Sequence, residues 1–75
     1  MVDTMLVMDY RMVDILNADQ LEPGDLIGLG IIGIVKIISV ASIKDGFLLV
    51  IENEFSERED VEIKDDEKFE LYILE

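Results

Sequence analysis

The 75-residue sequence contains no cysteine, no histidine and no tryptophan, and Pro23 is its single proline. Without cysteine the chain forms no disulfide, and without cysteine and histidine it lacks the usual ligands of a structural zinc site. A chain of this length buries only about 60% of the surface that its unfolded form exposes. We therefore expect its stability to come from dense apolar packing or from self-association.

Positive charge is also scarce, since 6 Lys and Arg residues stand against 18 Asp and Glu residues and the net charge is -12. Eleven of the acidic residues lie between Glu52 and Glu75. A surface of this charge repels phosphate backbones and anionic lipid, and it attracts basic surfaces. We expect a basic protein partner, with no direct binding of nucleic acid and no membrane association.

Hydrophobic residues make up 51% of the sequence, which is too many for a disordered acidic tail. We expect a single folded domain over residues 10–75, preceded by a disordered extension over residues 1–9. Residues 1–10 carry two aspartates and no basic residue, and their longest apolar run is Met5–Met8, which is too short for an export signal. The expected location is the cytoplasm.

The first third of the chain predicts one strand, one helical turn and one tight turn. The segment Tyr10–Leu16 alternates weakly, with Val13 and Ile15 on one side and Met12, Asp14 and Leu16 on the other, which favours a short strand. The segment Asn17–Gln20 has capping residues at its two ends and leaves room for a short helical turn near residues 18–21. Pro23-Gly24-Asp25 has the composition of a turn, because proline fixes φ and glycine accepts positive φ.

The middle of the chain is rich in β-branched residues, which fit a pleated sheet better than a helix. We expect strands near Leu26–Ile31 and Ile34–Ala41, divided by glycines. Lys44-Asp45-Gly46 predicts a hairpin turn and Phe47–Glu52 the returning strand. Both arms of this hairpin are apolar on both faces, so we expect them to lie centrally in the sheet or to cover an interface.

The last third alternates cleanly over Val61–Lys64 and Phe69–Ile73, as half-solvated antiparallel strands do. The segments between, residues 53–60 and 65–68, are charged and turn-like. The predicted fold is all-β, a small antiparallel barrel of five to six strands.

The arrangement of a strand, Leu21-Glu22-Pro23-Gly24-Asp25 and a second strand resembles the entry into SH3-like β-barrel modules. The resemblance covers about ten residues and concerns the fold alone. Barrels of this kind host peptide binding, nucleic-acid binding, assembly and regulation, so the resemblance implies no single activity.

Three local patterns have a functional interpretation and a simpler structural one. Gly28 to Gly33 has the G-x-G-x-x-G spacing of dinucleotide-binding loops, but strand-forming residues follow where that motif needs a helix, which favours bends in a sheet. The 18 residues from Leu26 to Ile43 approach the length of a membrane span, but they contain three glycines and a central lysine and have no flanking basic cluster. Asp65-Asp66-Glu67 does not fit an EF-hand and is expected to be a solvated turn.

Catalysis has little support in the sequence. Histidine and cysteine are absent, and none of the three serines, Ser39, Ser42 and Ser56, has an evident base. We expect no enzymatic activity, no cofactor and no metal site.

The candidate recognition surface is the segment from Glu52 to Asp60, which places five acids and one aromatic around Arg58. Such a pattern can engage a Lys- and Arg-rich surface with an apolar contact at its centre, although charged runs often serve solubility alone. The predicted partner-binding residues are Glu52, Glu54, Phe55, Glu57, Glu59, Asp60 and Tyr72.

Two functions fit these observations. The first is a non-catalytic interaction module that docks on a basic protein, similar in size and charge to phage-encoded inhibitors and accessory factors. The second is a structural subunit that self-associates through the apolar strands near Ile34–Val40 and Phe47–Ile51, giving a homo-oligomer.

Overall fold

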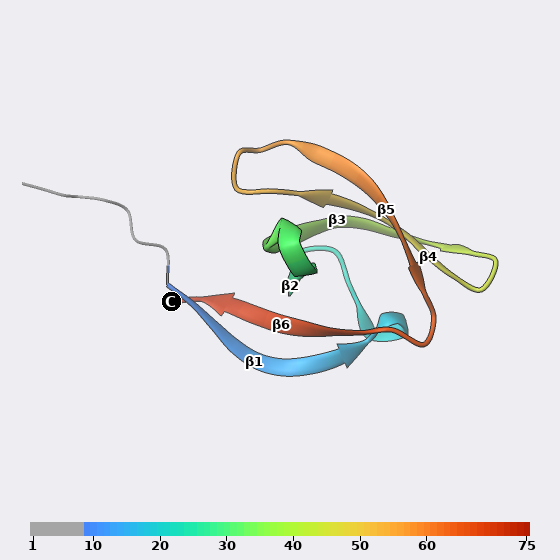
Figure 1. Ribbon diagram of the computed structural model, residues 1–75, viewed down its shortest axis with the longest axis horizontal. Coiled ribbons are helices and arrows are strands. Elements are labelled where there is room, and N and C mark those ends of the chain that lie inside the picture. Colours follow the sequence, from blue (N-terminus) through green and yellow to red (C-terminus); the bar gives the residue numbers. More distant parts are fainter. Residues whose placement is uncertain (1–8) are drawn as a thin grey trace, which may run out of the picture.

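The computed structural model of the protein describes residues 9–75 and confirms the all-β prediction (Figure 1). Two single-turn 3-10 helices, η1 and η2, interrupt the strands. The elements are β1 (Tyr10–Asn17), η1 (Ala18–Gln20), β2 (Leu26–Gly28), η2 (Gly30–Ile32), β3 (Ile34–Ile43), β4 (Gly46–Glu52), β5 (Arg58–Lys64) and β6 (Lys68–Leu74).

The six strands form one antiparallel sheet in the order β1-β6-β2-β3-β4-β5. The sheet curls so that β1 and β6 lie opposite β4 and β5, with η2 between them (Figure 1). This shape is compatible with a small barrel-like fold. In the described part of the chain, however, β1 and β5 are the edges of the sheet and do not pair with each other, so the strands form an open sheet and not a closed ring.

The core lies on the inner face of this curled sheet. Its most deeply buried side chains are Ile27, Ile37 and Leu49, each fully shielded from solvent. Alternate residues of each strand point to opposite faces, so a few positions per strand are enough to fill this interior. The remaining buried hydrophobic residues are Ala18, Leu21, Val35, Ile51, Ile63 and Phe69.

The β3–β4 hairpin forms where the sequence predicts it. Asp45 adopts a φ of 63° in the turn, and the two arms pair from Ile43 with Gly46 through to Lys36 with Glu52. Both arms lie in the interior of the sheet order, between β2 and β5. Of the two placements expected for these apolar strands, the structure shows the central one.

The first connection is held by backbone and side-chain hydrogen bonds. The Gln20 side chain accepts a hydrogen bond from the Asn17 amide at 2.8 Å, which fixes η1 at the predicted helical turn. In the Pro-Gly turn Gly24 has a φ of 96°, and its amide donates to the Ile37 carbonyl at 2.7 Å. The turn is therefore attached directly to β3.

The structure corrects two predicted boundaries. The strand expected over Leu26–Ile31 ends at Gly28, because Gly30 and Gly33 take φ values of 54° and 93° and turn the chain through η2. The turn-like segment expected over residues 53–60 ends earlier, since β5 already begins at Arg58. The three residues 58–60 pair with Glu52, Ile51 and Val50 and are strand, despite their charge.

The disordered extension expected over residues 1–9 lies outside the described residues, except for Asp9. The Asp9 carbonyl accepts a hydrogen bond from the Glu75 amide at 2.9 Å, which continues the β1–β6 pairing by one residue. Among the described residues, no helix has the length and apolar character needed to cross a membrane.

Candidate protein-interaction site

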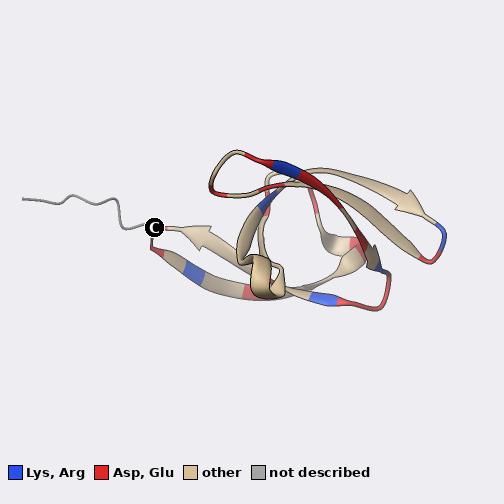
Figure 2. Cartoon of the chain, turned by 45° about the horizontal axis from the view of Figure 1, so that its top comes forward, with Lys and Arg blue, Asp and Glu red and all other residues tan. Residues whose placement is uncertain are grey.

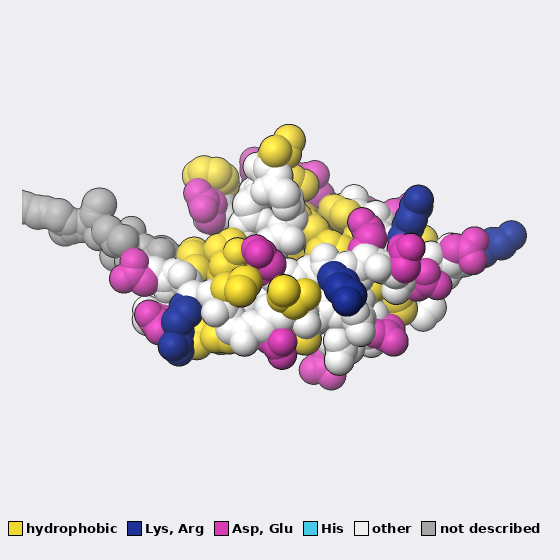
Figure 3. Space-filling model, turned by 60° about the horizontal axis from the view of Figure 1, so that its bottom comes forward, with side chains coloured by type: hydrophobic (Ala, Val, Ile, Leu, Met, Phe, Trp, Pro, Cys, Tyr) yellow, Lys and Arg dark blue, Asp and Glu magenta, His cyan; other side chains and the backbone are white. Residues whose placement is uncertain are grey.

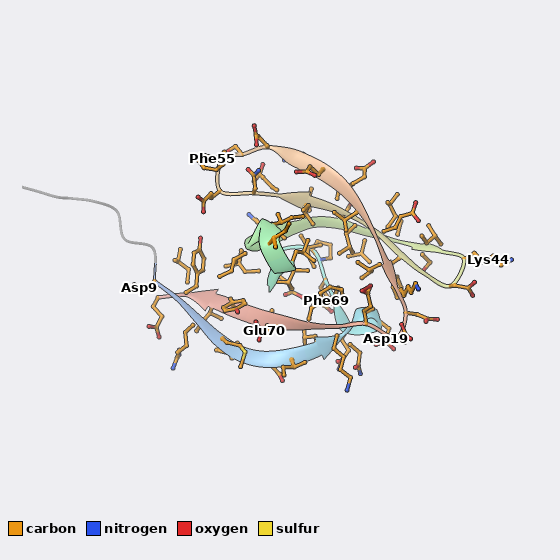
Figure 4. The ribbon with its side chains drawn as sticks, in the orientation of Figure 1. Asp9, Asp19, Lys44, Phe55, Phe69 and Glu70 are labelled. Atoms are coloured by element: carbon orange, nitrogen blue, oxygen red, sulfur yellow. The ribbon has the colours of Figure 1, made fainter. Side chains whose placement is uncertain are left out.

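The acidic loop, residues 53–57, joins β4 to β5 and presents an aromatic side chain between carboxylates. Phe55 lies at its tip with 74% of its surface exposed, and Glu54 and Glu57 beside it are also exposed. Figure 4 shows Phe55 at the end of the molecule opposite the hairpin tip that carries Lys44. An exposed aromatic side chain bordered by charged residues can serve as an anchor for a partner.

Asn53 gives this loop a defined shape. Its side-chain oxygen accepts hydrogen bonds from the amides of Phe55 at 2.8 Å and Glu57 at 3.0 Å. Its side-chain nitrogen donates to a carboxylate oxygen of Glu57 at 3.0 Å, and its own amide donates to the Glu57 carbonyl at 2.9 Å. Asparagine is suited to this role because its short side chain mimics a backbone turn. The hydrogen bonds of Asn53 therefore hold the loop in the conformation that exposes Phe55.

Glu52, at the base of the loop, belongs to a row of paired residues that crosses all six strands. Arg58 Nε lies 3.3 Å from the Glu52 carboxylate. On the other side, Lys36 of β3 is opposite Glu52 in the strand register. Glu52 is thus partly neutralised by its neighbours and is less available to a partner than the other acids. The row runs Met12, Tyr72, Leu26, Lys36, Glu52 and Arg58.

The remaining acids of the predicted site lie on β5, next to the loop. Glu59 pairs with the buried Ile51 and points to the inner side of the sheet, whereas Asp60 pairs with Val50 and points to the outer side. Both are exposed because β5 is an edge strand. Acidic residues gather along β5 and the loop in Figure 2, so the structure brings together all six predicted acidic-segment residues.

Tyr72 lies apart from this group. It sits on β6, and strands β2 and β3 lie between it and Glu52 along the row, which is a path of about 14 Å along the sheet at the usual strand spacing. The Tyr72 hydroxyl donates to a Glu70 carboxylate oxygen at 2.6 Å. This hydrogen bond to Glu70, together with burial and the negative charge of Glu70, raises the pKa of Tyr72 above its usual value.

The aromatic residue that borders the acidic loop on this side is Tyr10. A hollow of about 160 Å³ is lined by Tyr10 together with Leu26, Ile34, Lys36 and residues 52–54. Tyr10 stands near the start of an edge strand, and only the curl of the sheet brings it to the far hairpin. Its proximity to the loop is not predictable from the sequence.

A larger hollow, the β5 groove, lies on the inner side of β5. Its volume is about 390 Å³, and it separates β5 from η2 and from the beginning of β6. Hydrophobic side chains interrupt the charged surface of the molecule on the face shown in Figure 3. The groove is lined by Gly28, Leu29, Gly30, Ile32, Val61, Glu62, Ile63, Glu67, Lys68 and Phe69.

The acidic segment of residues 65–67 and the glycines of residues 28–33 have structural roles. In the β5–β6 turn a Glu67 carboxylate oxygen accepts from the Lys64 amide at 2.9 Å, and the Glu67 carbonyl accepts from the Ala18 amide at 3.0 Å. Within residues 9–75 no three Asp or Glu side chains are grouped so as to hold a metal ion. The glycines of residues 28–33 flank the single 3-10 turn η2, and strand β3 follows them where the dinucleotide motif needs an α-helix.

In comparisons with known proteins, the chain matches no protein-family model, no curated protein and no solved structure.

Proposed function

We propose that this protein is a non-catalytic interaction module that binds a basic protein surface through the acidic loop and the adjoining acids of β5. The observation that carries the proposal is Phe55, held 74% exposed between carboxylates by a loop whose shape Asn53 fixes. A pre-formed loop binds a partner without first having to be ordered, which reduces the entropic cost of association.

The charges support a basic partner. Glu54, Glu57, Glu59 and Asp60 are exposed, and the basic residues near them are Arg58 in the same segment and Lys36, which lines the hollow that includes Glu54. Opposite charges at the rim of an interface speed association and select the partner, while the aromatic anchor supplies apolar contact area. The same field disfavours nucleic acid and anionic membranes as partners.

We place the curled sheet among SH3-like barrel modules on the strength of its size, its strand number and the Leu21–Asp25 entry. We further propose a cytoplasmic role as an accessory or inhibitor protein of phage type, acting by occupying a basic surface. These assignments rest on charge, size and fold alone.

The test compares binding of the chain to a panel of purified basic proteins, with duplex DNA as the anionic counter-probe. Substituting both Glu54→Lys and Glu57→Lys should weaken binding at least tenfold, and Phe55→Ala should weaken it by about tenfold. The matched control, Asp19→Lys with Glu22→Lys, changes the net charge equally at exposed positions outside the loop and should have a smaller effect. Equal losses in both double variants would mean that net charge and not the loop determines binding.

A second candidate function is assembly of several copies, and the position of β1 at the edge of the described strands favours it. Met12, Val13 and Ile15 are 48%, 45% and 55% exposed on this edge strand, and exposed apolar edges are sites of strand pairing between chains. Sedimentation of the full chain across a range of concentrations tests it. A monomer at all concentrations contradicts assembly, and a dimer abolished by Ile15→Lys supports it.

A further inference from the structure

Strand β5 has one edge that no other described strand covers. Among the described strands β5 pairs only with β4, so the backbone amides and carbonyls on its other edge have no strand partner. An unpaired strand edge of seven residues is a template for the addition of another strand.

The β5 groove runs along this free edge. Val61, Glu62 and Ile63 all line it, although successive side chains of a strand point to opposite faces. Because Val61 and Ile63 face inward and Glu62 faces outward, this lining indicates that the backbone edge of β5 forms part of the wall. The unpaired hydrogen-bonding groups of β5 therefore face the groove.

The inner side of the groove is apolar. Ile63 and Phe69 are 6% and 8% exposed at its floor, and Ile32 remains 47% exposed on η2. An added strand has its side chains on alternate faces, so every second one would reach this apolar surface. A segment with alternating apolar residues fits such a surface.

The acidic outer side of β5 favours basic residues at the outward positions of an added strand. Asp60 and Glu62 point outward, because the residues between and beside them, Val61 and Ile63, face the interior. Side chains directly opposite one another on neighbouring strands interact, and opposite charges stabilise the pair. The central outward positions of an added strand should therefore be Lys or Arg.

We propose that β5 binds an extended peptide segment in which apolar and basic residues alternate. The segment adds to the sheet as a seventh strand, with its apolar side chains in the β5 groove and its basic side chains beside Asp60 and Glu62. This inference rests on the proposed function for the charge of the partner, and it adds the backbone conformation and sequence pattern of the bound segment.

Pairing of β5 with β5 of a second copy is disfavoured. If two β5 strands paired antiparallel along their full length, Asp60 would lie opposite Glu62 and Arg58 opposite Lys64 of the partner strand. Both pairs join like charges, which is destabilising on adjacent strands. The charges on β5 thus oppose self-pairing and favour a basic segment.

The experiment measures binding of labelled peptides to the full chain by fluorescence anisotropy. The probe alternates four valines with four lysines, and the control peptide has the same composition in two blocks. Two further probes carry backbone N-methyl groups, one on all its valines and one on all its lysines, which removes the amide donors of one edge or the other. We expect the alternating peptide to bind at least tenfold more tightly than the block peptide, and one N-methylated peptide to lose this advantage while the other keeps it.

Two substitutions with similar exposure test the location. Ile32→Ser should weaken binding of the alternating peptide at least fivefold, because Ile32 lines the groove. Ile43→Ser, at a position 38% exposed in the β3–β4 hairpin, should leave binding unchanged. Glu62→Lys should weaken binding of the alternating peptide. Binding of the block peptide should change only with the net charge of the variant and not with the position of the substitution.

The outcomes separate this inference from the proposed function. Equal binding of alternating and block peptides, or equal binding of both N-methylated peptides, overturns strand addition, and the proposed function stands if Glu54→Lys with Glu57→Lys still weakens binding. A preserved preference for alternation without any effect of those loop substitutions keeps strand addition and overturns the loop. No binding of either basic peptide at low salt overturns both.

Discussion

Asn53 is the residue on which the shape of the acidic loop depends. Its side chain contacts the amides of Phe55 and Glu57 and a carboxylate oxygen of Glu57, all within 3.0 Å. The loop also contains Ser56 at a φ of 64°, a conformation that a non-glycine residue adopts only where the surroundings enforce it. One asparagine thus couples the backbone of the loop to the position of its aromatic residue.

The substitution Asn53→Ala should make the acidic loop more flexible, because it removes the side-chain hydrogen bonds of Asn53. We expect the free energy of unfolding to fall by about 1 kcal/mol, since the lost hydrogen bonds are partly replaced by water. Amide exchange should accelerate at Phe55 and Glu57, measured by NMR on the full chain. Exchange rates at these two amides that match the wild type would contradict the role given to Asn53.

Tyr72 and Glu70 provide a titration with a defined sign. Because Glu70 raises the pKa of the Tyr72 phenol, Glu70→Gln should lower it toward the ordinary tyrosine value, as followed by ultraviolet absorbance of tyrosinate. The raised pKa means that the folded state holds this proton more firmly than the unfolded state. The associated stability is present below the ordinary pKa and is lost as pH rises through the raised one.

Comparing the wild type with Tyr72→Phe identifies the Tyr72 transition, because the sequence contains two tyrosines. A tyrosinate transition of Tyr72 that is the same in the wild type and in Glu70→Gln would contradict the hydrogen bond between Tyr72 and Glu70.

At the scale of elements, the turn of the β3–β4 hairpin depends on Gly46. A Cβ added there would collide with the carbonyl of Ile63 on β5, because the two backbones are in close contact. Gly46→Ala should therefore lower the free energy of unfolding by about 2 to 3 kcal/mol, measured by urea denaturation.

Gly24→Ala is the matched control for this substitution. Gly24 has a φ of 96° and no atom within 4 Å of an added Cβ, so only backbone strain of about 1 kcal/mol is expected. A cost at Gly46 no greater than at Gly24 would show that β5 can move away from the hairpin.

The sequence predicts most of these elements because their signals are local. Alternation identifies β1, β5 and β6, and Asp45-Gly46 identifies the hairpin between β3 and β4. The end of β2 is missed because β-branched residues continue through Ile31 and Ile32, while the backbone follows the glycines around them. The side chains of Ile31 and Ile32 favour a strand, but the positive φ values of Gly30 and Gly33 turn the backbone into η2.

Part of the candidate site can be predicted from a local sequence pattern, and part depends on the fold of the whole sheet. Its acids and Phe55 are contiguous in the sequence and are brought together by one hairpin, so a linear pattern is enough to predict them. Tyr10 and the β5 groove depend on the curl of the whole sheet, which places η2 and β6 opposite β5. No local pattern contains that information, and for the same reason Tyr72 is distant from the loop.

For the molecule as a whole, the net charge of -12 opposes compaction. The described residues contain only two ion pairs, Arg11 with Glu75 at 2.8 Å and Arg58 with Glu52 at 3.3 Å, and both are largely exposed. Such pairs contribute little to stability, so repulsion among the remaining carboxylates should dominate.

Salt should therefore stabilise the fold. Raising the sodium chloride concentration from low to physiological values should increase the melting temperature by a few degrees, roughly 3 to 8 °C, followed by circular dichroism. Sodium chloride is suitable because it screens charge with little effect on apolar burial. A melting temperature that falls with salt would mean that attractive ion pairs outweigh the repulsion.

The most direct test of the account is to map a bound basic partner on the full chain by NMR, using amide shift changes as the alternating valine–lysine peptide is added. The account predicts the largest changes in the acidic loop and along β5, residues 53–63, with smaller changes at Ile32 and Phe69 in the groove. Changes centred on the acidic β5–β6 turn, residues 65–67, or spread evenly over all carboxylate-bearing residues would contradict it.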